Sequence, residues 1–183
     1  MPDKYVESDR FLFLTTPLGP NALLLESFTG QEGLSELFSF QLELLSENQK
    51  IAFDAILGQK VSFGVNGPGG HTKRMFHGIV SSFTQLPSNL RLARYRAEVV
   101  PQFWLLPRRA RSRIFQGKSA DEILRVLLDG IDVAYELTSS FPKRDYTVQY
   151  RETDFEFASR LMEEEGIFYY FRHTGSTHKL VLA

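Results

Sequence analysis

The feature that most constrains this chain of 183 residues is a strict alternation of apolar and polar side chains in its first half. In "FSFQLELLS", Phe38, Phe40, Leu42 and Leu44 alternate with polar residues. A period of two predicts a β-strand with one face towards a core and the other towards water. The stretch "ARYRAEVV" repeats the pattern. The core of the first half is therefore expected to lie on one face of an antiparallel sheet.

Other short apolar runs predict further strands. "FLFLTT" and "NALLLESFTGQE" flank the turn Pro17–Pro20 and are predicted to pair with each other. "KIAFDAILG" predicts a short helix that stops at Gly58, and "KVSFGV" with "MFHGIVSSFTQL" predicts a hairpin around Asn66-Gly67. The 16 Phe and 7 Tyr suit packed sheet. Because so many strands usually close up, we predict an antiparallel β-barrel-like domain over residues 1–115.

Helical spacing replaces the alternation in the second half. "SADE" from Ser119 and "TDFE" from Thr153 are capping boxes, in which two side chains satisfy free amide groups at a helix start. The first helix is predicted to end near Gly130 and the second at Gly166. The predicted apolar faces are Ile123, Leu124, Leu127 and Leu128 on the first helix, and Phe155, Ala158, Leu161 and Met162 on the second.

Strands are predicted between and after these helices. "YTVQY" lies between them, and "IFYYF" follows the second helix as a strand packed on both faces. "HKLVLA" resembles the middle of a strand, so we expect the chain to be cut short there and to leave a sheet edge for another segment to cover. The predicted fold class is α+β, mainly β: the barrel-like domain, then a smaller α/β part with two helices over residues 116–183.

The acidic run "EEE" at the end of the second helix is the first candidate for chemistry. Glu163, Glu164 and Glu165 are about 100° apart around a helix, so their carboxylates fan out. No histidine stands beside them at metal-ligand spacing. We interpret the run as a helix end that faces solvent or a partner.

Composition excludes several classes of protein. The net charge of −1 gives no overall attraction to nucleic acid or an anionic membrane. The absence of cysteine removes disulfides, thiolate catalysis and cysteine zinc sites, and fits a reducing compartment. "MPDKYVESDR" is too charged for a secretory signal peptide, and no apolar run approaches the roughly 20 residues of a membrane span.

The histidines and arginines are the other candidates. His173 and His178 could face each other across a hairpin and bind a metal, but no Cys, Asp or Glu joins them nearby, so turn and strand-surface positions are favoured. His77 is interpreted as a sheet residue, and His71 as part of the hairpin loop "GPGGHTK", which lacks the ending of a phosphate loop. "PRRARSR" contains a cluster of four arginines: Arg108, Arg109, Arg111 and Arg113. We interpret it as a structural connector, or as a patch that pairs with acidic groups of a partner subunit, and not as a phosphate-binding site. No G-x-S-x-G motif occurs. We predict no catalytic, cofactor-binding or metal-binding residue and no enzyme activity.

The ordered series "LFSFQLELLS", "FHGIV", "YRAEVVPQFWLL", "RIFQ", "YTVQYRETDFEFASRLMEEEGIFYYF" and "HKLVLA" resembles the N-terminal portion of the VgrG family, the spike proteins of the bacterial type VI secretion system. The resemblance runs from about Phe11 to the end and is most specific from "VQYRE" through "EEEGI". The same region is also similar to the hub protein of contractile phage tail baseplates.

This resemblance implies a structural role. It implies a hub fragment of a homotrimer that sits on the hexameric Hcp tail tube, with baseplate proteins as further partners. The tip protein and the effectors would attach through C-terminal regions absent here. It implies assembly in the bacterial cytoplasm, then secretion by the type VI system, with no nucleic acid partner, no cofactor and no stable membrane insertion.

Three other readings stay open. A hub of a phage or tail-like bacteriocin has overlapping sequence patterns. A hydrolase would use the acids Glu163 to Glu165, or Asp154 with a histidine. A nucleic-acid-binding module would use Arg108 to Arg113, with salt-dependent binding.

Overall fold

The computed structural model describes residues 10–67, 73–87 and 91–183. It divides into two compact units. The first comprises residues up to Glu32, Phe38–Pro101 and His173–His178, and the second comprises Gly33–Leu37, Gln102–Arg172 and Lys179–Ala183. Each unit has its own set of strands and its own buried side chains, so each is described by itself.

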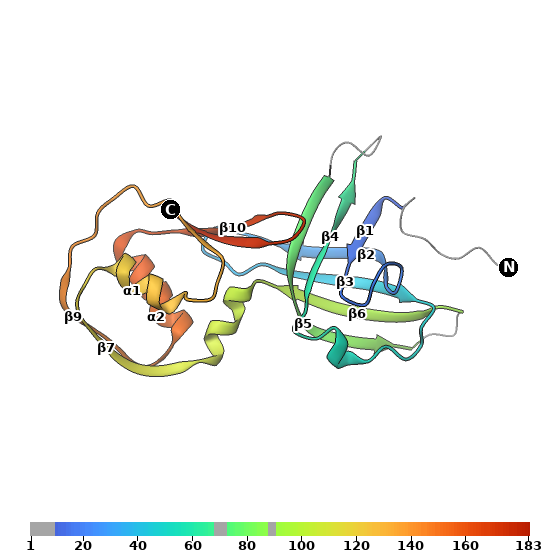
Figure 1. The fold of residues 1–183 in the computed structure, drawn as a ribbon, viewed down its shortest axis with the longest axis horizontal. Coiled ribbons are helices and arrows are strands. Elements are labelled where there is room, and N and C mark those ends of the chain that lie inside the picture. The colour runs from blue at the N-terminus through green and yellow to red at the C-terminus, as the bar shows by residue number, and fades with distance from the viewer. Residues whose placement is uncertain (1–9, 68–72, 88–90) are drawn as a thin grey trace. The chain divides into compact units, whose positions relative to one another are not determined.

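The first unit contains a six-stranded antiparallel sheet in the order β1-β4-β5-β6-β3-β2 (Figure 1). Two β-bulges, in β2 and β5, break the register. Arg10, before β1, donates to the carbonyl oxygen of Leu25 in β2 at 2.9 Å. The two edges of the sheet therefore approach each other, and the predicted barrel-like form is confirmed. The strands are β1 Leu12–Thr15, β2 Leu24–Gln31, β3 Ser39–Ser46, β4 Lys60–Asn66, β5 Lys73–Leu86 and β6 Ala93–Val100.

The period of two is confirmed in β3 and β6. Phe38, Phe40, Leu42 and Leu44 are all buried, and the polar residues Gln41 and Glu43 between them are more exposed. In β6 the buried side chains are Tyr95, Ala97 and Val99. The interior is aromatic, because phenylalanine rings from β2, β3, β4 and β5 meet there with centroids 4.6 to 6.5 Å apart: Phe28, Phe40, Phe63 and Phe76. These packed rings fill the sheet interior.

One prediction about the first unit was wrong. β1 and β2 do not pair, since β1 pairs with β4 and β2 with β3. The short helix predicted at "KIAFDAILG" is present as the 3₁₀ helix η1 Phe53–Ala55, followed by Gly58 at φ 72°. The predicted hairpin is confirmed by the antiparallel β4–β5 ladder, although residues 68–72 of its loop, with His71, lie outside the described residues.

The second unit contains the 3₁₀ helix η3 Gln102–Arg108 and the helices α1 Ala120–Leu127 and α2 Asp154–Glu165. A two-stranded antiparallel ribbon is formed by β7 Ala110–Lys118 and β9 Arg144–Thr153. β8 Val133–Tyr135, β10 Tyr169–His173 and β11 His178–Leu182 form a small sheet in the order β10-β11-β8. β8 and β11 are parallel, and the residues that join β10 to β11 belong to the first unit.

The capping boxes start both helices as predicted. Thr153 Oγ1 accepts from the Glu156 amide at 3.1 Å, and Glu156 Oε2 accepts from the Thr153 amide at 2.8 Å. At α1 the Glu122 carboxylate accepts from the Ser119 amide at 3.0 Å. Gly166 closes α2 in the left-handed conformation, at φ 71°. These bonds satisfy groups that a helix end leaves free.

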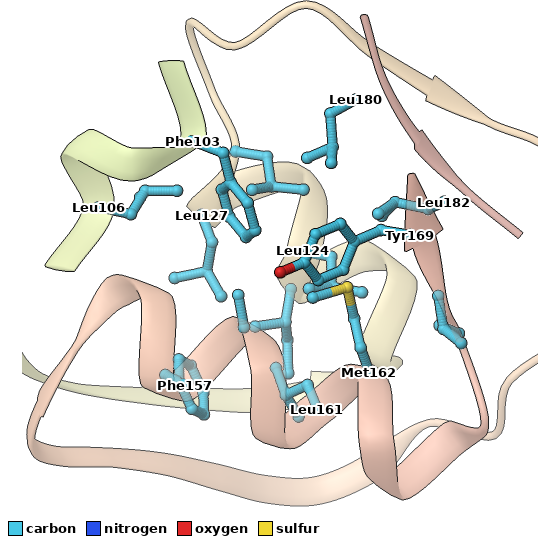
Figure 2. Close-up of a cluster of buried hydrophobic side chains, with 14 of the residues drawn as sticks. Phe103, Leu106, Leu124, Leu127, Phe157, Leu161, Met162, Tyr169, Leu180 and Leu182 are labelled. Carbon is cyan, nitrogen blue, oxygen red and sulfur yellow. The ribbon is translucent and has the colours of Figure 1, made fainter. Parts of the chain in front are cut away.

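The helices bury their apolar faces in one core (Figure 2). The predicted apolar face of α1 is confirmed. On α2, Phe155 was predicted to belong to the buried face but is only half-buried, and Phe157 is fully buried instead. Side chains from η3, β10 and β11 close the core: Phe103, Leu106, Tyr169, Leu180 and Leu182. Burial raises the pKa of the Tyr169 hydroxyl to about 12.

Two strand predictions in the second unit need correction, and one strand was not predicted. "IFYYF" is not packed on both faces, because Phe168 precedes β10 and is 44% exposed. β11 confirms the strand in "HKLVLA", but it lies between β10 and β8 and is not a sheet edge. The strand β7 was not predicted: it begins at Ala110 inside the arginine run and includes Arg111 and Arg113.

Candidate functional site

A buried histidine cluster forms where β5 meets the segment that joins β10 to β11. His77 Nδ1 and His178 Nδ1 are 2.7 Å apart, although 101 residues separate them in sequence. His173 Nδ1 lies 3.1 Å from the amide nitrogen of His77 and 3.2 Å from its carbonyl oxygen. His77 and His178 are 3% and 6% exposed, so the predicted strand-surface position of His178 is wrong.

The contacts of the cluster are those of a hydrogen-bonded network. His77 Nδ1 and His178 Nδ1 are within hydrogen-bond distance at 2.7 Å, so one ring donates and the other accepts. Among the described residues, no group of three His, Asp or Glu side chains has an arrangement that could hold a metal ion.

Burial favours the neutral form of the His77 and His173 rings, which lie beside aromatic side chains. Phe38 lies 4.8 Å from the His173 ring and 5.8 Å from the His178 ring, centroid to centroid. Burial lowers the pKa of His77 to about 4, and the positive charge of Lys60 and the His173 ring add to this effect. Burial also lowers the pKa of His173 to about 4, against the opposing hydrogen bond with the His77 carbonyl. The contacts between the β10–β11 connection and the sheet are therefore expected to weaken when His77 and His173 become protonated.

This cluster predicts a loss of stability in mild acid. Histidines of the unfolded chain titrate near pH 6.5, whereas His77 and His173 in the fold titrate near 4, so the unfolded state binds more protons in between. The free energy of unfolding should be highest above pH 6.5 and should fall as the pH drops to 4, by an order of 2 to 3 kcal/mol for each ring. Urea unfolding at pH 7.5, 5.5 and 4.5 measures it.

The double variant His77→Gln/His173→Gln is the comparison for this measurement. It removes the two titrations while carboxylate titrations remain, so its free energy of unfolding should change less between pH 7.5 and 4.5. Equal pH dependence in the two proteins would show that other groups carry the effect.

The arginine run is divided among separate contacts. Arg108 stacks over the Trp104 ring at 4.0 Å, and Arg113 donates to Asp154 Oδ1 at 2.5 Å. Arg111 is half exposed and lies 3.9 Å from the same carboxylate. Arg109 lines a surface hollow of about 110 Å³ beside Asp129. This volume is far below that of ordinary ligand pockets, which is roughly 300–1,000 Å³. The run spans the end of η3 and the start of β7, and Arg108, Arg109 and Arg111 are its exposed members.

Asp154, a candidate acid in the hydrolase reading, is buried in a polar network. Its carboxylate accepts from Arg113 and, at 2.9 Å, from Gln149 Nε2. Gln149 is fully buried and also accepts from Arg113 Nε at 2.8 Å. All three groups therefore have partners inside the fold. Asp154 stabilises the junction of β7, β9 and α2, and no histidine of the buried cluster belongs to its unit.

The acidic helix end also binds arginine. Glu164 Oε2 and Glu165 Oε1 each lie 2.6 Å from a different nitrogen of Arg144, at the start of β9. Glu164 also pairs with Arg160 at 3.2 Å. The predicted fan of carboxylates is thus partly wrong, because neighbouring side chains converge on one guanidinium. Glu163, like Glu164, is exposed, and Glu165 is half-buried.

The outer face of the β7–β9 ribbon is a feature that the sequence analysis did not find. Tyr146 and Tyr150 on β9 are 69% and 66% exposed, and Ile114 on β7 is 68% exposed. Val148, which lies opposite Ile114 in the ladder, is 38% exposed. We name these four side chains the ribbon face. The signal was present in the alternation of "YTVQY", but alternation alone does not say which set of side chains points inward.

Comparison with known proteins identifies the family to which the chain belongs. Residues 31–183 match the model of the phage tail baseplate hub (GPD) family. The chain is 42% identical over 95% of its length to the type VI secretion system spike protein VgrG1a of Pseudomonas aeruginosa. It is 40% identical over its whole length to VgrG1c of the same organism. It spans 27% and 25% of these two relatives, about a quarter of their length.

A solved structure supports the same relationship. The E. coli c3393 protein, described as a component of the type VI secretion system with structural similarity to the T4 bacteriophage tail proteins gp27 and gp5, superposes with a TM-score of 0.83. The sequences are 27% identical, and the match covers 93% of this chain and 48% of that one. The resemblance to VgrG stated from the sequence is confirmed. No helix in the described part of the chain has the length and apolar character needed to cross a membrane.

Proposed function

Since the chain belongs to the phage tail baseplate hub family, we propose that it serves as the hub region of a VgrG spike, the puncturing component of a type VI secretion system. The observation that carries this proposal is the 42% identity to VgrG1a along 95% of the chain. The family is one of structural proteins, and we propose that this chain has no enzyme activity of its own.

The proposed action is mechanical. Three copies of the full-length protein would form a ring that sits on the Hcp tail tube and meets the baseplate proteins. A closed ring suits this role, because cyclic symmetry completes every subunit's exposed contacts with those of a sister copy. The aromatic interior of the six-stranded sheet supports the stiffness that such a ring needs. In this reading residues 1–115 are a barrel-like hub domain and residues 116–183 begin an α/β part.

The proposal extends to further partners of the full-length spike. We propose that the tip protein and effectors attach through C-terminal regions of the spike, and that the assembled protein passes from the bacterial cytoplasm to the outside or into a target cell. Neither nucleic acid binding nor stable membrane insertion forms part of the proposal. The net charge of −1 gives no general attraction to either.

The rival readings have less support. A phage or bacteriocin hub would share the family, but the two relatives compared above are type VI spike proteins. For the hydrolase, Asp154 is engaged by Arg113 and Gln149, and two of the three helix-end glutamates are engaged by Arg144. For the nucleic-acid module, Arg108 and Arg113 are held by Trp104 and Asp154.

The experiment is a mass measurement of the protein at its full encoded length. Light scattering should give the mass of a trimer, and added Hcp hexamer should co-elute with it. A stable monomer that does not bind Hcp would overturn the hub proposal. Parallel measurement of this 183-residue region alone is expected to give less trimer, because less of the hub is present.

A further inference from the structure

Within the described part of the chain, the first half of β5 has a ladder along only one of its two edges. Residues 73–78 pair with β4, but pairing with β6 begins only at Ile79. The His77 amide donates to His173 Nδ1 at 3.1 Å instead of to a backbone carbonyl. The His77 carbonyl oxygen faces the same ring nitrogen, at 3.2 Å. The His173 ring therefore stands where a neighbouring strand would otherwise satisfy the β5 backbone.

The connection from β10 to β11, residues 173–178, covers this edge, and we name it the strap. It is assigned to the first unit, as are β4 and β5. Besides the His173 contact, His178 Nδ1 lies 2.7 Å from His77 Nδ1. Ser62 Oγ on β4 donates to the Gly175 carbonyl oxygen at 2.7 Å. Two of these three hydrogen-bonded contacts between the strap and the sheet therefore depend on histidine nitrogens.

Both histidine contacts need a ring nitrogen that carries no proton. His173 Nδ1 can accept from the His77 amide only when it is unprotonated. A protonated His173 ring could donate to the His77 carbonyl oxygen, but the amide would then lose its acceptor. At the second contact, either His77 or His178 must offer a bare nitrogen, because two N–H groups cannot face each other at 2.7 Å. The closed strap thus excludes full protonation of the cluster by its geometry.

The surroundings of the cluster also oppose a proton. Burial is the main reason why the pKa of His77 and of His173 falls to about 4, and the charges of Lys60 on β4 and Arg74 on β5 add to it at His77 and His173 respectively. The Glu32 carboxylate, which follows β2, lies 3.8 Å from His173 Nε2 and 3.7 Å from the Arg74 guanidinium. His173 Nε2 is buried and has no hydrogen-bond partner among the described residues. A proton gained by the closed strap would find little compensation.

We propose that the strap is a proton-controlled cover of the β5 edge: proton binding by the histidine cluster releases residues 173–178 while the six-stranded sheet stays paired. The release is local, because the β3–β6 ladder and the phenylalanines of the sheet interior contain none of these histidines. Opening exposes the edge of residues 73–78 and the Phe38 ring, which His173 and His178 contact in the closed form. An uncovered strand edge can pair with another strand, so the strap determines the pH at which this edge becomes available.

This local event differs from the loss of global stability predicted above, and it does not rest on the proposed hub function. A ring that titrates near pH 6.5 in the open strap and near 4 in the closed strap shifts the opening equilibrium by roughly 30-fold between pH 7.5 and 5.0. The sign follows from the same values, since the open form binds more protons between pH 6.5 and 4.

The experiment is hydrogen–deuterium exchange of the full-length protein at pH 7.5 and 5.0, followed by mass spectrometry. Each exchange rate is divided by the chemical exchange rate at the same pH, which gives a protection factor for each segment. The reporting segments are residues 73–78 and 173–178, and the reference segment is residues 93–100 of β6. The double variant His77→Asn/His173→Asn is the matched control, because an amide oxygen in place of Nδ1 accepts a hydrogen bond and does not titrate in this range.

The protection factor of the His77 amide and of the strap should fall tenfold or more at pH 5.0, while that of residues 93–100 changes much less. In the double variant the fall should be at least fivefold smaller. The proposal is overturned if protection of the strap does not change with pH, if residues 93–100 lose protection to the same extent, or if the double variant responds like the parent. Should the double variant fail to fold, the comparison of the two segments in the parent protein still decides.

Discussion

Replacement of Asp154 by alanine is expected to lower the free energy of unfolding by about 3–5 kcal/mol, the cost of leaving a buried charge without its partner. Asp154 is 3% exposed and binds both Arg113 and Gln149. Its loss would leave the Arg113 guanidinium facing a buried amide with no counter-charge. Urea unfolding followed by circular dichroism measures the change.

Two further variants separate the charge from the packing. Asp154→Asn keeps the size of the side chain and a hydrogen-bond acceptor for Gln149, so it should cost less than alanine. The double variant Asp154→Leu/Arg113→Met removes both charges and should recover part of the stability lost in the single alanine variant. A double variant as unstable as the sum of its separate changes would show that the ion pair is not the cause. A fully stable Asp154→Asn protein that lost a hydrolytic activity would revive the enzyme reading.

Replacement of Gly64 by alanine is the other change with a large expected effect. A Cβ atom at Gly64 would lie 1.9 Å from the carbonyl oxygen of Arg74 in the neighbouring strand β5. Real atoms do not approach so closely, so the β4–β5 ladder must open or shift. We expect a loss on the order of 4 kcal/mol or more, the range of the most damaging single changes. Thermal unfolding and the yield of soluble protein measure it.

Gly175→Ala is the matched control in the same unit. The nearest atom to a Cβ at Gly175 is the Met75 sulfur, at 3.6 Å, which is an ordinary van der Waals contact. This variant should unfold close to the parent temperature. Similar melting temperatures for the Gly64 and Gly175 variants would contradict the close approach of β4 and β5.

Local patterns predicted much of the fold because their causes are local. The alternation in β3 fixes which side chains can face a core, and the capping bonds of Thr153 and Glu156 form within four residues of chain. The hairpin of β4 and β5 follows from neighbouring strands and a short connection. The resemblance to VgrG rested on the order of such local segments, and the family match over residues 31–183 confirms it.

Non-local pairing was not predictable in the same way. "FLFLTT" and "NALLLESFTGQE" are neighbours in sequence, yet β1 pairs with β4 and β2 with β3, because the closing sheet offers each edge strand a different partner. His77 and His178 meet across 101 residues, and neither has a local signal for the other. Long-range contacts of this kind depend on the whole topology.

By itself, the sequence determined where most strands and both helices begin and end, through side-chain period, capping and glycine conformation. Only the tertiary structure decided the direction in which β9 faces. In "YTVQY" either alternating set of side chains could be buried. Arg113 and Asp154 hydrogen-bond to Gln149 and so favour the orientation in which Gln149 is buried. A strand's alternation fixes two sets of side chains, but the groups packed beneath it determine which set is buried, and here they leave two tyrosines exposed.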